Sequence, residues 1–127
     1  MIPKHKIIDD LFRYFDQIRY VAIYTDNDLV LRQKEAVPDS SSSQTDQYEE
    51  LLVNPTLLTA ARQRGNIDCG GLRYLIVGYG NFYQLLRAIN GGHISICLNK
   101  DTDLNKIPEE IFGQLNLWYP DLCSGLA

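Results

Sequence analysis

Residues 70–99 read GGLRYLIVGYGNFYQLLRAINGGHISICLN, and this stretch decides the fold. It contains three runs rich in β-branched, aromatic and aliphatic residues: Leu72–Tyr79, Phe82–Ile89 and His93–Leu98. Gly-Asn and Asn-Gly-Gly sequences separate these runs, and both residue types tolerate the positive φ angles that tight hairpin turns require. The stretch therefore predicts a three-stranded antiparallel meander. Few of its side chains resemble catalytic groups, so we expect a scaffold with binding surfaces.

Before this stretch, the apolar periodicity changes from helical to extended. Apolar side chains recur every three or four positions over Ile7–Ile18, which is typical of an amphipathic helix. The runs Tyr20–Tyr24 and Leu29–Gln33 flank a polar Thr-Asp-Asn-Asp turn and predict a hairpin. Residues 34–45 contain four consecutive serines and predict a mobile polar loop.

The middle of the chain predicts two consecutive helices. Asp46 and Glu49 match a capping box in front of a short helix over Gln47–Leu52. Because proline lacks a backbone donor and clashes with the preceding turn, we expect Pro55 to interrupt this helix. The Asn-Pro pair there is a good N-terminus for a second helix, predicted over Pro55–Arg64.

The whole chain reads as one α+β domain over residues 1–127, with the element order α-β-β-α-β-β-β-α. A last helix is expected over residues 107–118, capped by Asp103 or Asn105, with a short tail at 119–127. Both faces of the run Leu72–Tyr79 are apolar, so the antiparallel sheet needs helices on both faces, or a partner on one.

Composition excludes several classes of function. The formal net charge is −4 and basic residues do not cluster, which disfavours nucleic-acid binding. The three cysteines form no Cys-x-x-Cys pair, which indicates a reduced cytoplasmic setting. No signal-peptide core precedes the domain, and no apolar run approaches the roughly 20 residues of a membrane helix. We therefore expect a cytoplasmic protein with no membrane insertion.

The element order resembles the roadblock / dynein-light-chain family. The matching segments are the first helix Ile7–Ile18, the hairpin Val21–Leu31, the run Leu72–Val77 and the strand Gly92–Leu98. The resemblance implies a five-stranded antiparallel sheet of profilin-like architecture, with the first and last helices on one face and the middle helix on the other. It also implies dimers in which the third strands pair edge to edge. In this family such dimers regulate or scaffold Ras-like small GTPases, or serve dynein and Rag-type assemblies.

The residues also favour a dimer without the resemblance. The run Leu72–Tyr79 has one neighbour in the meander, and its apolar edge carries no proline and only one charged side chain, Arg73. We expect a dimer interface, with an identical or related domain, made by this strand and the apolar side of the middle helix. The predicted interface residues are Arg73, Leu75, Val77, Leu57, Leu58 and Ala61. The leading interpretation is a non-enzymatic dimeric adaptor or regulator.

Two alternatives belong to other classes. One is a small-molecule sensor of the profilin/PAS/GAF-like group, with a pocket lined by four aromatic residues: Tyr74, Phe82, Tyr83 and Trp118. The other is a small enzyme that uses Cys69 or His93, although no base lies near either in the sequence.

The remaining site-like patterns have structural explanations. The segment Gly78–Tyr83 lacks the third glycine and the following helix of a dinucleotide fingerprint. The paired aspartates of two loops fit turn chemistry and helix capping better than a cation site; they are Asp26, Asp28, Asp101 and Asp103. The sequence therefore predicts no catalytic residues, no cofactor and no metal.

Overall fold

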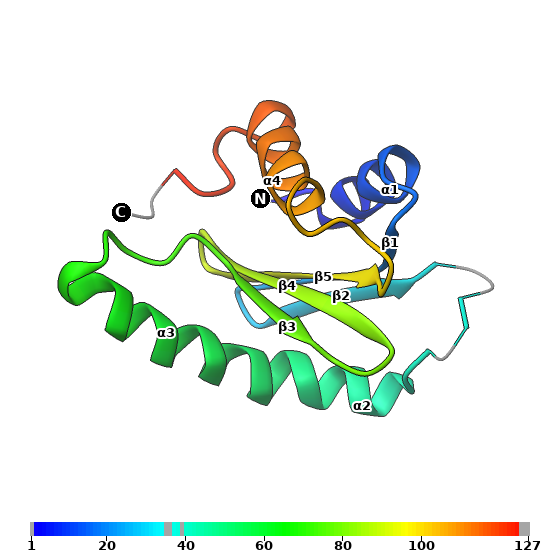
Figure 1. Cartoon of the computed structure of the whole chain (residues 1–127), viewed down its shortest axis with the longest axis horizontal. Helices are drawn as coiled ribbons and strands as arrows, with labels where there is room; N and C mark the ends of the chain where they lie inside the picture. Colours follow the sequence, from blue (N-terminus) through cyan, green and yellow to red (C-terminus); the bar gives the residue numbers. More distant parts are fainter. Residues whose placement is uncertain (1, 35–36, 39, 125–127) are drawn as a thin grey trace.

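A five-stranded antiparallel sheet with helices on both faces organises the part of the chain described by the computed structural model, residues 2–34, 37–38 and 40–124 (Figure 1). The elements in chain order are α1 (Lys4–Tyr14), β1 (Ile18–Thr25), β2 (Asp28–Gln33), α2 (Ser43–Tyr48), the π-helical segment η1 (Glu49–Val53), α3 (Asn54–Asp68), β3 (Leu75–Gly78), β4 (Phe82–Ile89), β5 (Gly92–Asn99) and α4 (Ile107–Trp118). The strand order is β2-β1-β5-β4-β3. The predicted α+β class and element order are confirmed.

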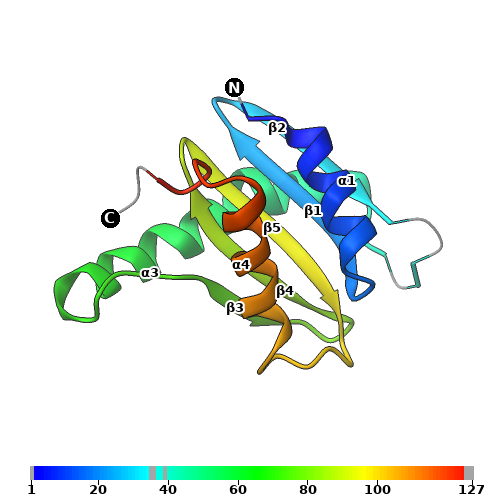
Figure 2. The ribbon, with the colours of Figure 1, turned by 90° about the horizontal axis from the view of Figure 1, so that it is seen from above.

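The helices form two layers. Helices α1 and α4 lie over one face of the sheet, as the view from above shows (Figure 2). The segments α2, η1 and α3 run as one long helix across the opposite face (Figure 1). The first and last helices therefore share a face, and the middle helix has the other to itself. Among residues 2–34, 37–38 and 40–124, no helix combines the length and apolar character that crossing a membrane requires.

The two long hairpins have turns that suit their residues. Asp26 and Asn27 join β1 to β2 with φ angles of 53° and 62°, the left-handed pair that a two-residue hairpin turn requires. Gly91 turns β4 into β5 with a φ of 83°. Gly92 meets the backbone of β1 so closely that a Cβ there would lie 1.7 Å from the Tyr24 carbonyl oxygen. Only glycine fits at that position.

The apolar core lies between the sheet and the α1/α4 layer. Its buried side chains come from α1, α4 and the facing side of the central strands; they include Ile7, Ile8, Leu11, Val21, Ile23, Leu85, Ile94, Ile96, Leu98, Ile111, Phe112 and Leu115. The predicted tail contributes as well, because Leu122 is buried and its carbonyl accepts a hydrogen bond from the Asn90 N–H at 2.9 Å. Residues 125–127 of that tail lie outside the described part.

The first helix is shorter than predicted. It ends at Tyr14, where Phe15 turns to extended backbone, and Ile18 already belongs to β1. The prediction over Ile7–Ile18 was wrong at its end because a fully buried strand follows directly. Nearly every residue of β1 is buried on both faces, so its apolar side chains continued the helical pattern by coincidence.

The middle helix is not interrupted at Pro55, which corrects the prediction of two helices. The Asn54 N–H donates to the Glu49 carbonyl five residues back, so a wide π-helical turn accommodates the proline. Ser42 is the N-cap, since its Oγ accepts from the Thr45 N–H at 3.2 Å, and the predicted capping box is wrong. Of the loop predicted over residues 34–45, residues 43–45 are helical, and residues 35, 36 and 39 lie outside the described part.

Strand β3 covers only Leu75–Gly78 instead of the predicted Leu72–Tyr79. Gly70 and Gly71, with φ angles of 79° and 88°, turn the chain back from the end of α3. Tyr74 then packs its ring against Phe112 of α4, with ring centroids 5.2 Å apart, and does not join the strand ladder. The edge of the sheet is therefore four residues long.

Candidate functional site

Strand β3 presents a free edge. Within the described part of the chain it pairs only with β4. The Tyr79 N–H donates to the Phe82 carbonyl at 2.9 Å, and backbone bonds alternate along an antiparallel pair. Leu75 and Val77 therefore bond to β4, whereas the backbone groups of Ile76 and Gly78 point outward. These outward groups can accept another strand.

Exposed apolar side chains lie on the β3 hairpin and along the long helix. Of the eight large hydrophobic residues exposed in the described part, six belong to the long helix and the β3 hairpin: Tyr48, Leu51, Leu52, Ile67, Ile76 and Tyr79. We call these six residues, together with the β3 edge, the docking surface. Contiguous apolar exposure typically marks an interaction site; Ile76 and Tyr79 belong to the β3 hairpin itself, whereas Leu51 lies beside β2 at the other edge of the sheet.

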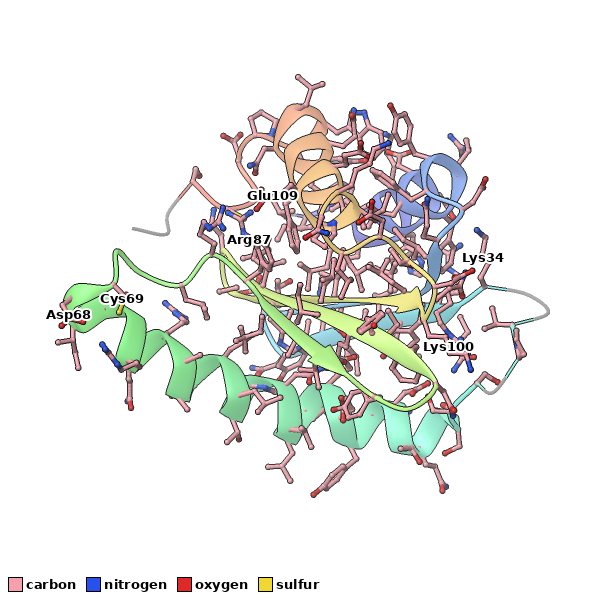
Figure 3. The ribbon with its side chains drawn as sticks, in the orientation of Figure 1. Lys34, Asp68, Cys69, Arg87, Lys100 and Glu109 are labelled. Carbon is pink, nitrogen blue, oxygen red and sulfur yellow. The ribbon has the colours of Figure 1, made fainter. Side chains whose placement is uncertain are left out.

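The second half of α3 has few contacts within its own chain. It extends beyond the edge of the sheet, and Figure 3 places Asp68 and Cys69 at its far end. Residues 59–68 are exposed apart from half-buried Ala61 and buried Gly65, which packs against the returning backbone at Gly71. Most of the stability of a helix in a protein comes from tertiary packing, which this end of the long helix largely lacks. A partner along this side would supply the missing packing.

Most of the predicted interface residues remain accessible. Five of the six are exposed or half-buried: Arg73, Leu75, Val77, Leu57 and Ala61. The side chains of the two β3 residues face the long helix, because they stand opposite Leu86 and Gln84 in the sheet. Leu58 differs from the others, since it is only 4% exposed and packs within the chain. The interface itself stays a prediction.

A buried polar layer joins the long helix to the sheet beneath it. Glu50 is fully buried, and its Oε2 accepts a hydrogen bond from the Tyr20 hydroxyl at 2.8 Å. Its Oε1 lies 2.8 Å from the His93 Nε2 and accepts from the Asn54 Nδ2 at 2.9 Å. Asn54 and Gln84 exchange a pair of side-chain hydrogen bonds at 3.2 Å. A connected network of this kind fixes the position of the helix.

Sequence reasoning missed this layer. It left His93 without a carboxylate partner, because Glu50 lies 43 residues away in the chain. The available signal was the spacing of Asp46, Glu50 and Asn54, each four residues apart on a helix. Polar residues at that spacing usually indicate a solvent-facing stripe, whereas here all three are buried.

Burial and the nearby carboxylates shift several pKa values in this region. Burial, reinforced by Glu50, raises the pKa of the Tyr20 phenol far above its ordinary value. Burial and Glu49 raise the pKa of Tyr79 to about 12. Burial, with a smaller contribution from Glu50, raises the pKa of the Cys97 thiol well above its usual range. Cys97 is therefore an inert thiol at neutral pH.

The residues of the other candidate sites do not come together in the structure. Tyr74, Tyr83 and Trp118 pack against the α1/α4 core, whereas Phe82 packs on the opposite face of the sheet, so the four aromatic residues line no common pocket. Cys69 is exposed, and its Sγ donates to Asp68 at 3.3 Å. In the described part, no three His, Cys, Asp or Glu side chains lie close enough to hold a metal ion.

Comparison with known proteins does not place the chain in a family. No protein-family model matches the chain, and no curated protein matches it significantly. The resemblance to the roadblock / dynein-light-chain family therefore stays a prediction from element order.

Proposed function

We propose that this chain is a non-enzymatic adaptor or regulator that works as a dimer through the docking surface. The observation that carries the proposal is the free edge of β3, with exposed Ile76 and Tyr79 on its hairpin and four further exposed apolar side chains along the long helix. An isolated edge can bind many strands, but an edge beside a long helix with few contacts of its own favours a partner that covers both.

A second copy of the chain fits both features. In a twofold dimer each surface meets itself, so β3 would pair antiparallel with its twin and extend the sheet. The long helix lies on one face of the sheet beside β3 (Figure 1). Pairing two edges would thus bring two long helices onto the same face of the extended sheet.

The partner class we propose is a Ras-like small GTPase or a complex that the dimer scaffolds. Support comes from the order of elements, which the structure and the roadblock resemblance have in common.

Light scattering over a micromolar concentration series tests the dimer. The wild-type chain should have twice the monomer mass. Ile76→Pro removes an outward-pointing N–H and leaves the β4 ladder intact, so this variant should be monomeric and folded by circular dichroism. Leu117→Ser changes an apolar residue on α4 that is more exposed than Ile76, at 74% against 39%, and should remain dimeric. A monomeric wild type would end the dimer proposal.

The partner class needs a separate experiment. Affinity capture with the wild type and with Ile76→Pro, in GDP or a non-hydrolysable GTP analogue, should recover a Ras-like GTPase in a nucleotide-dependent manner with the wild type alone. Recovery of no GTPase with either nucleotide would restrict the proposal to scaffolding.

A further inference from the structure

A cavity of about 310 Å³ lies between the start of the long helix and the sheet. It is lined by α2, η1 and two serines of the loop before them on one side, by β1, β2, β4 and β5 on another, and by the turn between β3 and β4. Its volume is at the small end of the range of about 300–1,000 Å³ that is typical of small-molecule sites. The cavity is separate from the α1/α4 core, which lies on the other face of the sheet.

Its walls are built from buried polar side chains. Six lining residues are at most 7% exposed: Arg19, Tyr20, Asp46, Glu50, Gln84 and Cys97. Buried polar groups are costly unless they have partners, and hydrogen bonds within the chain supply partners for most of these. A few oriented polar groups around a hollow are typical of a ligand site.

The charge of the cavity is negative. Asp46, Glu49 and Glu50 line one wall, and in the described part none lies within 4 Å of a lysine or arginine nitrogen. Neutral groups satisfy the first two, since Asp46 accepts from Ser41 and Gln33, and Glu49 accepts from the Tyr79 hydroxyl at 3.0 Å. Like charges that share one wall repel one another, so a cation between them would be stabilised.

The cationic side chains near the cavity offset this charge only in part, since one arginine faces three carboxylates among the lining residues. Arg19 lines the cavity, but its guanidinium lies 5.3 Å from the centre of the Phe82 ring and donates to the carbonyls of Asn81 and Pro38. Lys34 and Lys100, labelled at the same end of the molecule in Figure 3, are not among the lining residues. The raised pKa values of Tyr20 and Cys97 agree with a negative field in the cavity, since burial and then Glu50 cause both shifts.

The aromatic residues of the lining supply the apolar part of the site. Tyr79 and Phe82 lie with their ring centroids 5.5 Å apart, and Tyr20 lines the cavity from β1. Aromatic faces attract organic cations as well as apolar rings. We propose that this cavity binds a small organic monocation, a primary ammonium group on an aromatic body the size of phenethylamine. The ammonium faces Asp46 and Glu49, and the ring contacts Tyr79 and Phe82.

Three probes of one shape test the charge preference by isothermal titration calorimetry on the full chain: tyramine, neutral 4-propylphenol and anionic 3-(4-hydroxyphenyl)propionate. Tyramine should bind at least about tenfold more tightly than 4-propylphenol, a ratio equal to about 1.4 kcal/mol. The propionate should not bind measurably. Equal affinities for the three probes, or no detectable heat with tyramine, would overturn the proposal.

Two variants localise the site. Glu49→Gln keeps the acceptor for Tyr79, and Asp46→Asn keeps a side-chain oxygen, so both should fold; each should weaken tyramine binding by about tenfold. Glu110→Gln removes the same charge from an exposed position on α4 and should bind tyramine like the wild type. Wild-type affinity in both cavity variants, or an equal loss in the control, would contradict the site. Light scattering on the same samples reports the dimer independently, so the two proposals fail separately.

Discussion

The two sides of strand β5 show two ways of holding a protein together. On one side, Ile94, Ile96 and Leu98 pack into the apolar core under α1 and α4. On the other, His93 and Ser95 enter the polar layer beneath the long helix. The first side is stabilised by burial of apolar area, which depends on volume and little on direction. The second depends on donors and acceptors that meet at fixed distances.

This difference separates stability from function. The α1/α4 side is filled by aliphatic and aromatic residues from seven separate segments of the chain, among them the tail residue Leu122. The opposite side combines a polar layer, a cavity and an exposed helix face. We infer that the apolar side holds the sheet as a platform and that the polar side carries the binding properties proposed above.

The largest effect should come from the apolar side. Ile96→Ala removes a fully buried side chain, and the cavity that remains should lower the free energy of unfolding by about 4 kcal/mol. Urea denaturation followed by circular dichroism measures this loss. Ser95→Ala, at the next position and on the other face, loses one hydrogen bond to Gln84 and should cost only about 1 kcal/mol. Equal losses would mean that the two faces do not differ as described.

The next effect concerns the centre of the polar layer. Glu50→Ala leaves the donors of Tyr20 and Asn54 buried without their acceptor, and it removes the partner of His93. The expected loss of unfolding free energy is about 3 kcal/mol, as for breaking one side of a buried polar pair. Glu110→Ala, at an exposed position on α4, should change it by less than about 0.5 kcal/mol. If the Glu50→Ala protein were as stable as this control, the polar layer would not contribute to the stability of the fold.

The sequence predicts the apolar face of the sheet better than the polar face. The order of elements, the hairpins and the apolar face of β5 follow from residue periodicity and from turn residues such as Asp26 and Asn27, which act locally. The polar layer cannot be predicted from residue periodicity, because Glu50 and His93 meet only after the long helix crosses the sheet. The predicted interruption of the helix at Pro55 was wrong for a related reason. A π-helical turn accommodates the proline, and no local propensity indicates such a turn.

A smaller, pH-dependent effect concerns Tyr20. Burial and Glu50 raise its pKa in the folded chain, so the folded state keeps the phenol proton while the unfolded state loses it near pH 10. Stability from this group is therefore complete below pH 10 and declines above it, by up to about 1.4 kcal/mol per pH unit. Tyr79, whose pKa is raised to about 12, acts in the same direction.

Tyr20→Phe should separate the hydrogen bond from the titration. At pH 7 the variant loses the donor to Glu50 and should be less stable by about 1 kcal/mol. Between pH 10 and 11.5 its stability should fall less steeply than that of the wild type, because phenylalanine has no proton to lose. Urea denaturation at several pH values gives both curves. Parallel curves would show that Tyr20 does not keep its proton in the folded chain.

The smallest effect on stability should accompany an effect on assembly. Leu52 is 55% exposed on the outer side of the long helix, so Leu52→Ser should change the unfolding free energy of the monomer by less than about 0.5 kcal/mol. The same change should weaken the dimer by up to about tenfold if the exposed helix face meets its twin. Leu117→Ser, on the opposite layer at 74% exposure, should alter neither. A dimer that Ile76→Pro dissociates and Leu52→Ser leaves unchanged would show that the strand edge alone makes the contact, and the docking surface would then shrink to β3.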